Sequence, residues 1–428
     1  MDGSAAVAAA AFSRIISPAA NVNPVSDGYR TQRAVDPRTV GLVGGLFVLS
    51  AAAGAYEIAP ASVVPLVRDG LGIGPTAAGW LVSVMYLTAV VLSIPVGFAL
   101  DRFDVRRTVT AAALGLLVAG AWGWDAATAG AYRSLFASRI LGGAAYVVFW
   151  NAGADLVGQA VDADVRATAV SAFTASAPVG FALGQFGGPV VANALGWPAI
   201  FPVFATAAAL GVAVFLAATA GESFDDAIET PAPDPGQLAG VFRSRAVWTL
   251  STLSFLGFSL YLFVNSWLPS YLESELEVSL ALAGALTAVF PAMGVLSRTS
   301  GGVLSDRLFD GRRRPVVVLS FVLTAPAFAG FVAFASVPAV VALTVVSGFA
   351  IQLALGLLYT YVTEHVPDEV TGTAIAVMTS VGLFGAFLAP IVAAEIIAAR
   401  GYPDAFLAAL LVAVAGVVLA RTAPTDRD

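Results

Sequence analysis

Long apolar segments recur along almost the whole chain after residue 38. A helix needs about 20 apolar residues to cross the hydrocarbon core of a bilayer, and twelve such segments can be counted. Lipid offers no hydrogen-bond partner to an open strand or loop, so these segments are predicted to be helices and the fold an all-α polytopic membrane protein. They occupy residues 39–65, 76–100, 108–124, 133–157, 167–190, 197–219, 246–270, 279–303, 315–335, 338–362, 372–394 and 403–420.

Composition narrows the possible functions. Only 11% of the 428 residues are charged, against roughly 25% in soluble domains. The chain has no Cys and a single His, His365, which excludes disulfides, thiolate zinc sites and His-based metal clusters. All 21 basic residues are Arg, against 28 acidic residues, so no basic surface for nucleic acid is expected. We therefore expect the lipid bilayer as surroundings, no cofactor and no bound metal.

The Arg residues are unevenly distributed between the predicted loops. Sixteen lie in the two terminal tails, the central linker or the loops on the same side of the membrane as these segments. Because cytoplasmic loops retain positive charge, both termini are predicted to be cytoplasmic and the protein to lie in the cell membrane. The loops on the opposite side hold only Arg68, Arg133 and Arg400.

A polar stretch divides the twelve segments into six and six. Residues 221–245 contain five acidic residues in their first fourteen positions and three Pro, a composition typical of a solvated linker. The Ala-rich run near the N-terminus lacks a basic flank and is not expected to be a secretory signal. The predicted organisation is a cytoplasmic tail (1–38), a six-helix bundle (39–220), a cytoplasmic linker (221–245), a second six-helix bundle (246–420) and a cytoplasmic tail (421–428).

A shift of 205 residues aligns the two halves with each other. The register holds across four loops, which indicates an internal repeat rather than chance matches of apolar residues. An even number of helices per repeat gives both repeats the same orientation in the membrane, as in the parallel repeats of alternating-access transporters. The matched positions include Gly79 with Gly284, Gly97 with Gly302, Asp101 with Asp306, Arg102 with Arg307, Gly143 with Gly348, Gly180 with Gly385 and Gly196 with Gly401.

The loop after the second predicted helix carries a specific motif. Residues 97–107 read GFALDRFDVRR, and residues 302–314 of the second half read GVLSDRLFDGRRR. Both resemble the G-x-x-x-D-R-x-G-R-R signature of the major facilitator superfamily, with Asp104 replacing Gly in the first copy and two extra residues in the second. The resemblance implies two six-helix bundles that move a small solute by alternating access. It also implies a conformational latch, with Asp155 as a possible Arg partner; the alternative is that the basic residues only set the topology. The latch candidates are Gly97, Asp101, Arg102, Asp155, Gly302, Asp306 and Arg307.

Three charged residues fall inside predicted helices, where a charge costs about 2.5–3.5 kcal/mol even on lenient scales. Glu57 and Arg139 lie at similar depths in the first and fourth helices, which both face the central cavity in the superfamily. We expect an ion pair between them that protonation of Glu57 would break, coupling a proton to a conformational change. The alternatives are a static ion pair that braces the first bundle, or no pairing.

Arg298, in the eighth predicted helix, is the third such charge, and its repeat counterpart is Ser93. An Arg here resembles the arrangement in anion carriers of the superfamily, where it grips the substrate through two hydrogen bonds; the alternative is snorkelling to the interface. Membrane-interface belts are the favoured interpretation of Trp267 and Tyr361, and helix–helix hydrogen bonding competes with ligand contact for the buried amides. The other substrate-binding candidates are Tyr56, Trp150, Asn151, Tyr261, Asn265, Gln352 and Tyr359.

These features predict a monomeric, proton-coupled symporter of the superfamily that carries a small organic or inorganic anion. The alternative within transport is a multidrug/proton exporter, which the Gln185 in place of a superfamily Pro weakens. A membrane-embedded enzyme or sensor is disfavoured because no catalytic His, Cys or metal cluster is present. The absence of Lys beside abundant acidic residues resembles the composition of salt-adapted archaeal proteins.

Overall fold

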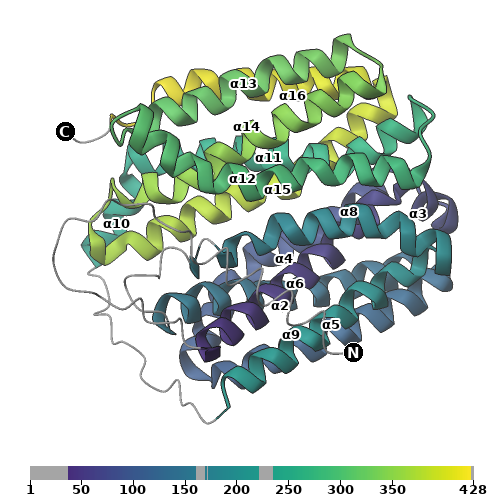
Figure 1. The fold of residues 1–428 in the computed structure, drawn as a ribbon, viewed down its shortest axis with the longest axis horizontal. Coiled ribbons are helices and arrows are strands. Elements are labelled where there is room, and N and C mark those ends of the chain that lie inside the picture. Colours follow the sequence, from purple (N-terminus) through teal and green to yellow (C-terminus); the bar gives the residue numbers. More distant parts are fainter. Residues whose placement is uncertain (1–36, 161–168, 171, 221–234, 426–428) are drawn as a thin grey trace, which may run out of the picture.

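Long helices make up most of the chain that the computed structural model describes, which comprises residues 37–160, 169–170, 172–220 and 235–425. Figure 1 shows them as two bundles lying side by side. The helices of the first bundle are α2 (Pro37–Ser62), α4 (Pro75–Arg102), α5 (Val105–Thr128), α6 (Tyr132–Ala160), α8 (Ser176–Leu195) and α9 (Ile200–Ala218). Those of the second bundle are α11 (Arg245–Ser274), α12 (Leu280–Leu308), α13 (Arg313–Ala333), α14 (Val337–Thr363), α15 (Thr371–Arg400) and α16 (Tyr402–Arg421).

Short helices lie at the two ends of the bundles. We call the end where α2 begins and α16 finishes the linker end, and the opposite end, which carries α3, the α3 end (Figure 1). The short helices are α3 (Val64–Leu71), η1 (Trp197–Ala199), α10 (Pro235–Arg243) and η2 (Asp368–Val370).

Local sequence explains where several helices begin and end. Asp104, the residue that departs from the superfamily signature, is the N-cap of α5, and its side chain accepts a hydrogen bond from the Arg107 N–H at 3.0 Å. At the α3 end, α8 and α15 stop at Gly196 and Gly401, whose φ angles of 86° and 87° favour glycine. These two glycines are repeat counterparts, so both halves turn in the same way.

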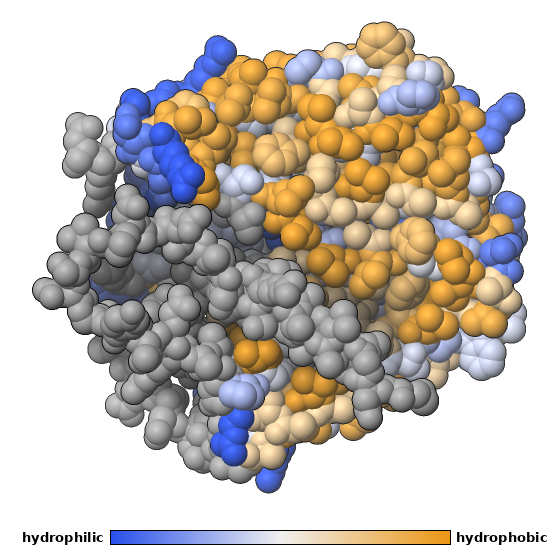
Figure 2. Space-filling model, viewed as in Figure 1, coloured by the Kyte–Doolittle hydropathy of each residue, from blue (hydrophilic) through white to orange (hydrophobic). Residues whose placement is uncertain are grey.

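The outer surface fits a bilayer. Figure 2 shows apolar side chains covering the middle of the visible face, with hydrophilic residues gathered toward its two ends. Leu114, Leu210 and Val418 are each about 60% exposed, at 58%, 65% and 60%, an arrangement expected where lipid replaces water. Ten helices of the described chain are long and apolar enough to cross a membrane. Helices α6 and α8 are the remaining two of the twelve; α6 carries polar residues including Arg139, and α8 is rich in Gly and Pro beside Gln185.

The predicted twelve-helix fold with two parallel repeats is confirmed, and the repeat is visible in the packing between the bundles. A Cβ atom on Gly79 of α4 would lie 3.0 Å from the carbonyl oxygen of Pro390 in α15. A Cβ atom on its counterpart Gly284 of α12 would lie 2.5 Å from the carbonyl oxygen of Gln185 in α8. Gln185 and Pro390 are also 205 residues apart, so the two crossings between the bundles are related by the repeat.

The contacts between the bundles lie toward the α3 end. Thr76, near the start of α4, donates its hydroxyl hydrogen to a Glu395 carboxylate oxygen near the end of α15, at 2.8 Å. The rings of Trp80 and Phe387 pack edge to face at 5.4 Å between the same two helices. These segments hold the bundles together at one end, which is the geometry of a carrier closed on that side.

Two predicted segments differ from the structure in detail. The second half of the predicted linker is not extended, because residues 235–243 form α10, which Val241, 2% exposed, anchors to the second bundle. The helix predicted at 167–190 continues to Leu195 as α8. Residues 161–168 and 171, the tail 1–36, the linker residues 221–234 and residues 426–428 lie outside the described chain.

Candidate functional site

Arg139 ties three helices together inside the first bundle. Its side chain is 0% exposed. Nη1 donates to the Tyr56 carbonyl oxygen at 2.8 Å, Nη2 to the Glu57 carbonyl oxygen at 2.6 Å, and Nε to the Leu81 carbonyl oxygen at 3.2 Å. The guanidinium carbon also lies 5.0 Å from the centre of the Tyr56 ring. Arg139 therefore joins α6 to the main chain of both α2 and α4.

A proline explains why Arg139 binds main-chain oxygen. Pro60 lies inside α2 and has no N–H, so the Tyr56 carbonyl four residues earlier loses its helical hydrogen-bond partner. An unpaired carbonyl inside a membrane bundle is costly and is usually satisfied by a neighbouring helix. Arg139 supplies that donor, and the site is therefore set by Pro60 as well as by the charge.

Glu57 does not form the predicted ion pair with Arg139. Its side chain is 1% exposed, and neither carboxylate oxygen has a hydrogen-bond partner among the described residues. The carboxylate interacts electrostatically with the Tyr86 hydroxyl of α4 and, less strongly, with Arg139. The ion-pair prediction is wrong because the donors of Arg139 bind main-chain oxygens, one of them freed by Pro60. Glu57 is left as a buried carboxylate with no cation in contact.

Arg298 lies where the two bundles meet. It is half-buried in α12, and its Nε atom is buried without a hydrogen-bond partner among the described residues. The guanidinium interacts electrostatically with Tyr146 of α6 and Tyr261 of α11, and Tyr146 in turn with Tyr359 of α14. No ion pair joins Arg298 to a carboxylate whose side chain the structure describes. Tyrosine hydroxyl groups from both bundles thus lie within electrostatic range of a cation that has no counter-ion in this part of the chain.

The repeat shows how room is made for Arg298. Ser93 and Asn151 are the first-bundle counterparts of Arg298 and Gly356, and there the Asn151 amide donates to the Ser93 carbonyl oxygen at 3.4 Å. In the second bundle Gly356 packs against Arg298, so that a Cβ atom on Gly356 would lie 3.1 Å from its Cα atom. With Gly in place of Asn, no amide side chain stands at this crossing, and the α14 backbone packs directly against Arg298.

Main-chain oxygens accept from two buried amides; the Gln352–Phe290 bond joins two helices, whereas the Asn265 amide bonds within α11. Gln352 donates to the carbonyl oxygens of Phe290 and Gly348, both at 3.1 Å, inside the second bundle. Asn265 donates to the Tyr261 carbonyl oxygen at 2.9 Å. The main-chain oxygen of Asn265, which Pro269 frees in the same way as Pro60 frees Tyr56, accepts from Gln185 at 2.5 Å across the bundles.

The structure places Tyr56 and the two residues expected at the membrane interface inside the protein and leaves Trp150 half-buried. Tyr56 lies in the core of the first bundle at 0% exposure, so the structure does not place it between the bundles. Trp150 is half-buried and packs on Phe173 at 5.6 Å. The interfacial interpretation of Trp267 and Tyr361 is wrong, since both are buried in protein, at 2% and 0% exposure. The Trp267 indole donates to the Pro390 carbonyl oxygen at 3.0 Å.

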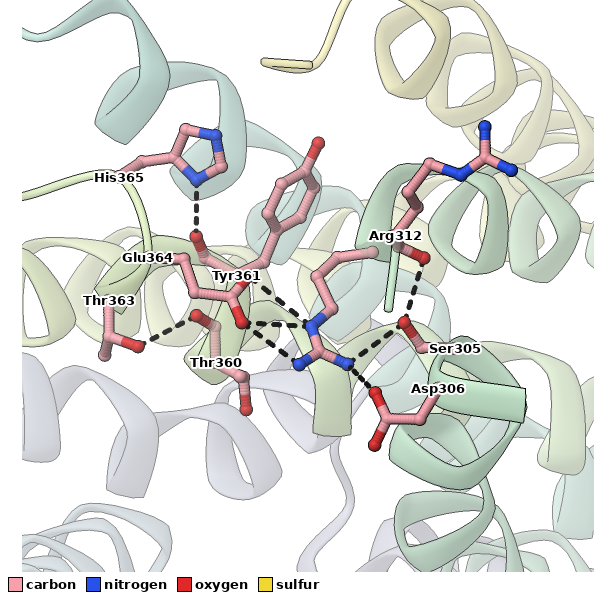
Figure 3. A network of polar contacts seen from close by, with 9 residues as sticks. Ser305, Asp306, Arg312, Thr360, Tyr361, Thr363, Glu364 and His365 are labelled. Atoms are coloured by element: carbon pink, nitrogen blue, oxygen red, sulfur yellow. Dashed lines mark hydrogen bonds and ion pairs between the residues drawn. The ribbon is translucent and has the colours of Figure 1, made fainter. Parts of the chain in front are cut away.

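The second copy of the loop motif forms a polar network at the linker end (Figure 3). Arg313 donates to Asp306 at 2.7 Å, to Glu364 at 3.1 Å and to the Ser305 hydroxyl at 3.0 Å. This joins the ends of α12 and α14 to the start of α13. Gly302 and the exposed Arg307 have no part in these contacts. The cation of the network is therefore Arg313 rather than the predicted Arg307, and Ser305, Asp306 and Glu364 all belong to the second bundle.

The first copy of the motif shows less contact. Gly97 has no atom within 4 Å of the place where a Cβ would stand, and Arg102 is exposed at the end of α4. The side chains of Asp101 and Asp155 lie outside the part of the chain that the structure describes. The latch stays a prediction.

The sequence profile of the Major Facilitator Superfamily matches residues 45–310 and 271–428. The chain belongs to the Major Facilitator Superfamily. Among solved structures, its fold is similar to a bacterial homologue of the human lysosomal transporter Spinster in an inward-facing, unoccupied conformation. The TM-score is 0.77 at 14% identity, over 91% of this chain and 97% of the other. At that identity the likeness shows the shared fold alone.

Relatives within the superfamily are named as anion transporters. The chain is 26% identical over 245 residues to the nitrite extrusion protein of Bacillus subtilis, covering 56% of this chain and 59% of that protein. It is 35% identical over 149 residues to the cis,cis-muconate transport protein of Acinetobacter baylyi, 34% of each chain. It is 26% identical over 343 residues to the probable nitrate/nitrite transporter NarK2 of Mycobacterium tuberculosis, 76% of this chain and 80% of that one. The match thus spans less than two thirds of the first two relatives.

Sequence reasoning missed three residues of this superfamily member's site. Tyr86 is the main polar neighbour of Glu57, Tyr146 lies near Arg298, and Gln185 crosses between the bundles. The type of Tyr86 and Tyr146 gave no signal, since Tyr occurs at many other positions of the predicted helices. For Gln185 the repeat could have indicated a role between the bundles. It is the repeat counterpart of Pro390, and both lie where the backbones of the two bundles cross.

Proposed function

We propose that the protein is a secondary transporter that binds a small anion at Arg298 and moves it across the cell membrane by alternating access, coupled to protons. The observation that carries the proposal is a guanidinium between the bundles with a buried, unpartnered Nε. A buried donor without a hydrogen-bond partner is costly inside a membrane bundle, even though the Arg298 side chain as a whole is only half-buried. A site that binds an anion supplies that partner during each transport cycle.

The surroundings of Arg298 favour an anion with planar, oxygen-rich geometry. A guanidinium offers parallel N–H donors that match a carboxylate or an oxyanion. The hydroxyl groups of Tyr146, Tyr261 and Tyr359 add hydrogen-bond donors from both bundles. Contacts from both bundles are what a substrate needs to favour closure around itself. The names of the nitrate, nitrite and muconate relatives support the same substrate class.

Alternating access has support in the asymmetric contacts between the bundles. The Thr76–Glu395 and Trp80–Phe387 contacts hold the α3 end closed. The two halves repeat each other, so rocking them about a central site exchanges one set of contacts for its counterpart. In this view Asp306, Glu364 and Arg313 keep the linker ends of the second bundle rigid, and the latch acts when the first-bundle motif docks onto them.

Glu57 is the proposed proton site. It is buried without a contacting cation, so placing a negative charge there in this conformation is costly. Tyr261 interacts electrostatically with both Glu57 and Arg298, which puts the two sites in electrostatic reach of one hydroxyl. Protonation of Glu57 removes a negative charge that competes with the anion for Arg298. Proton and anion binding therefore favour each other, as symport requires.

The topology is part of the proposal. The excess of Arg at the linker end supports a cytoplasmic location for both termini. A reporter enzyme that is active only in the cytoplasm, fused to Asp428, tests the location of the C-terminus. We expect this fusion to be active. We further propose that the monomer is the transporting unit.

Flux into proteoliposomes with an imposed pH gradient tests the function. Nitrate, nitrite, muconate and a cationic dye are supplied separately to the wild-type protein, to Arg298→Ala and to Arg400→Ala. Arg400 is the control because it is an exposed Arg of the same bundle with no proposed role in transport. We expect at least one anion to accumulate with the gradient, and only Arg298→Ala to lose anion affinity. Dye transport with no anion flux would instead indicate drug export.

A further inference from the structure

Aromatic and basic residues gather on the surface at the linker end. Phe242, at the end of α10, is 55% exposed, and Trp248, in the first turn of α11, is 45% exposed. The Trp248 indole donates to the Phe242 carbonyl oxygen at 2.8 Å, which fixes the two residues relative to each other. Arg243 and Arg245 flank the same turn and are exposed. Trp rings next to Arg side chains are typical of the level where a membrane meets water.

A cavity opens beside this turn. It has a volume of about 390 Å³ and is lined by Arg245, Ala246 and Thr249 from α11 and by Thr422 and Pro424, which follow α16. That volume lies within the range of small-molecule sites, about 300–1,000 Å³. No carboxylate with a described side chain forms an ion pair with Arg245. The cavity thus presents a positive charge and two hydroxyl groups at the linker end.

The wall after α16 is held in place by α14. The Tyr361 hydroxyl donates to the carbonyl oxygen of Pro424. A ring nitrogen of His365 lies 3.3 Å from the carbonyl oxygen of Thr425, and the other lies 2.9 Å from that of Tyr361. These contacts fix the backbone that closes the cavity on one side, so its shape is defined by the fold rather than by a loose tail.

An apolar stripe on α16 leads to the cavity. Leu411, Val414 and Val418 are 63%, 44% and 60% exposed. Together with Thr422 they recur at spacings of three and four residues, which places them on one face of the helix. That face has the character of a surface covered by a lipid acyl chain, and it ends at the cavity that Arg245 lines.

We propose that this cavity binds the phosphodiester headgroup of an anionic phospholipid, with its acyl chain along the exposed face of α16. Arg245 pairs with the phosphate, Thr249 and Thr422 contribute hydrogen bonds, and Trp248 marks the depth of the glycerol region. A headgroup without an amine is favoured because the cavity has no described carboxylate to bind one. The site lies apart from Arg298 and does not depend on the substrate.

Lipid retention by native mass spectrometry tests the site. The purified full-length protein is exchanged from mixed micelles of phosphatidylglycerol and phosphatidylcholine, and the two retained lipids are counted. We expect the wild-type protein to prefer phosphatidylglycerol, and Arg245→Ala to lose about fivefold of that preference, the effect of one Arg on an anionic lipid at a membrane surface. Arg400→Ala is the control, because Arg400 is an exposed Arg at the opposite end.

A second cavity variant and a comparison with inorganic phosphate distinguish a lipid site from a site for free anions. Thr249→Leu keeps the charge and narrows the cavity, so it is expected to lower retention as well, and it replaces Arg245→Ala if that variant does not fold. Inorganic phosphate added in detergent is expected not to raise the thermal unfolding midpoint, whereas phosphatidylglycerol is. An equal preference in the wild-type protein and both cavity variants would overturn the proposal. So would a phosphate effect as large as the lipid effect, which would indicate a site for free anions.

Discussion

Replacing Gly284 with Ala changes one of the two crossings between the bundles. A Cβ atom there would lie 2.5 Å from the Gln185 carbonyl oxygen and 2.6 Å from Cγ of Pro189. Neither neighbour yields easily, since one is backbone and the other a ring inside α8. Pro189 also frees the Gln185 carbonyl from its helical partner, so the glycine backbone packs against an otherwise unpaired oxygen. We expect Gly284→Ala to disfavour the arrangement that is closed at the α3 end.

The size of the effect follows from the geometry. Forcing one extra methyl group into a packed interface costs about 1–3 kcal/mol. If the opposite arrangement separates α8 from α12, the whole cost falls on the closed state. A difference of about 1–3 kcal/mol changes the ratio of the two arrangements about 5–150-fold. Gly372→Ala is the control, because Gly372 lies in α15 of the same bundle and a Cβ atom there meets nothing within 4 Å.

Cysteine cross-linking measures this ratio without background, since the natural chain contains no Cys. Thr76→Cys and Glu395→Cys replace a pair that is hydrogen-bonded at 2.8 Å across the bundles, and a short bifunctional maleimide reports their closure. We expect slower cross-linking with Gly284→Ala and no change with Gly372→Ala. If the two variants cross-linked at the same rate and had the unfolding temperature of the parent protein, the packing at Gly284 would not control closure of the α3 end.

The remaining predictions concern Glu57, Arg139 and Arg313. Glu57→Gln is expected to fold, because no cation contacts the carboxylate, and to abolish pH-driven accumulation while leaving substrate exchange; persistent accumulation in proteoliposomes would contradict the coupling role. Arg139→Leu is expected to lose about 1–3 kcal/mol for the unpaired Tyr56 carbonyl, seen as a lower unfolding midpoint. Combining it with Pro60→Ala gives the Tyr56 carbonyl a helical N–H partner again and should recover part of the lost stability. If the stability changes of the two single variants simply added up in the double variant, Arg139 would not be compensating for Pro60. Arg313→Ala should lower the unfolding midpoint more than Ala at the exposed neighbour Arg312, and equal effects would count against the network.

Much of the architecture could be read from the chain before folding. Apolar length fixed the twelve helices, because each has to satisfy its backbone internally in lipid. The shift of 205 residues predicted the relation between the bundles, and the Gly79 and Gly284 crossings show it in space. The rarity of charge in these segments singled out Glu57, Arg139 and Arg298, since every charge kept there is costly.

The partners of those charges were decided only by the tertiary structure. Sequence suggested a carboxylate for Arg139, but the structure provides main-chain oxygens, one of them freed by Pro60. Because every residue carries a main-chain carbonyl, the sequence does not indicate which carbonyl a distant side chain such as Arg139 binds. The neighbours of Arg298 likewise depend on how helices from two bundles rotate and dock. Composition thus determines which groups lipid makes costly, and packing determines what each of them binds.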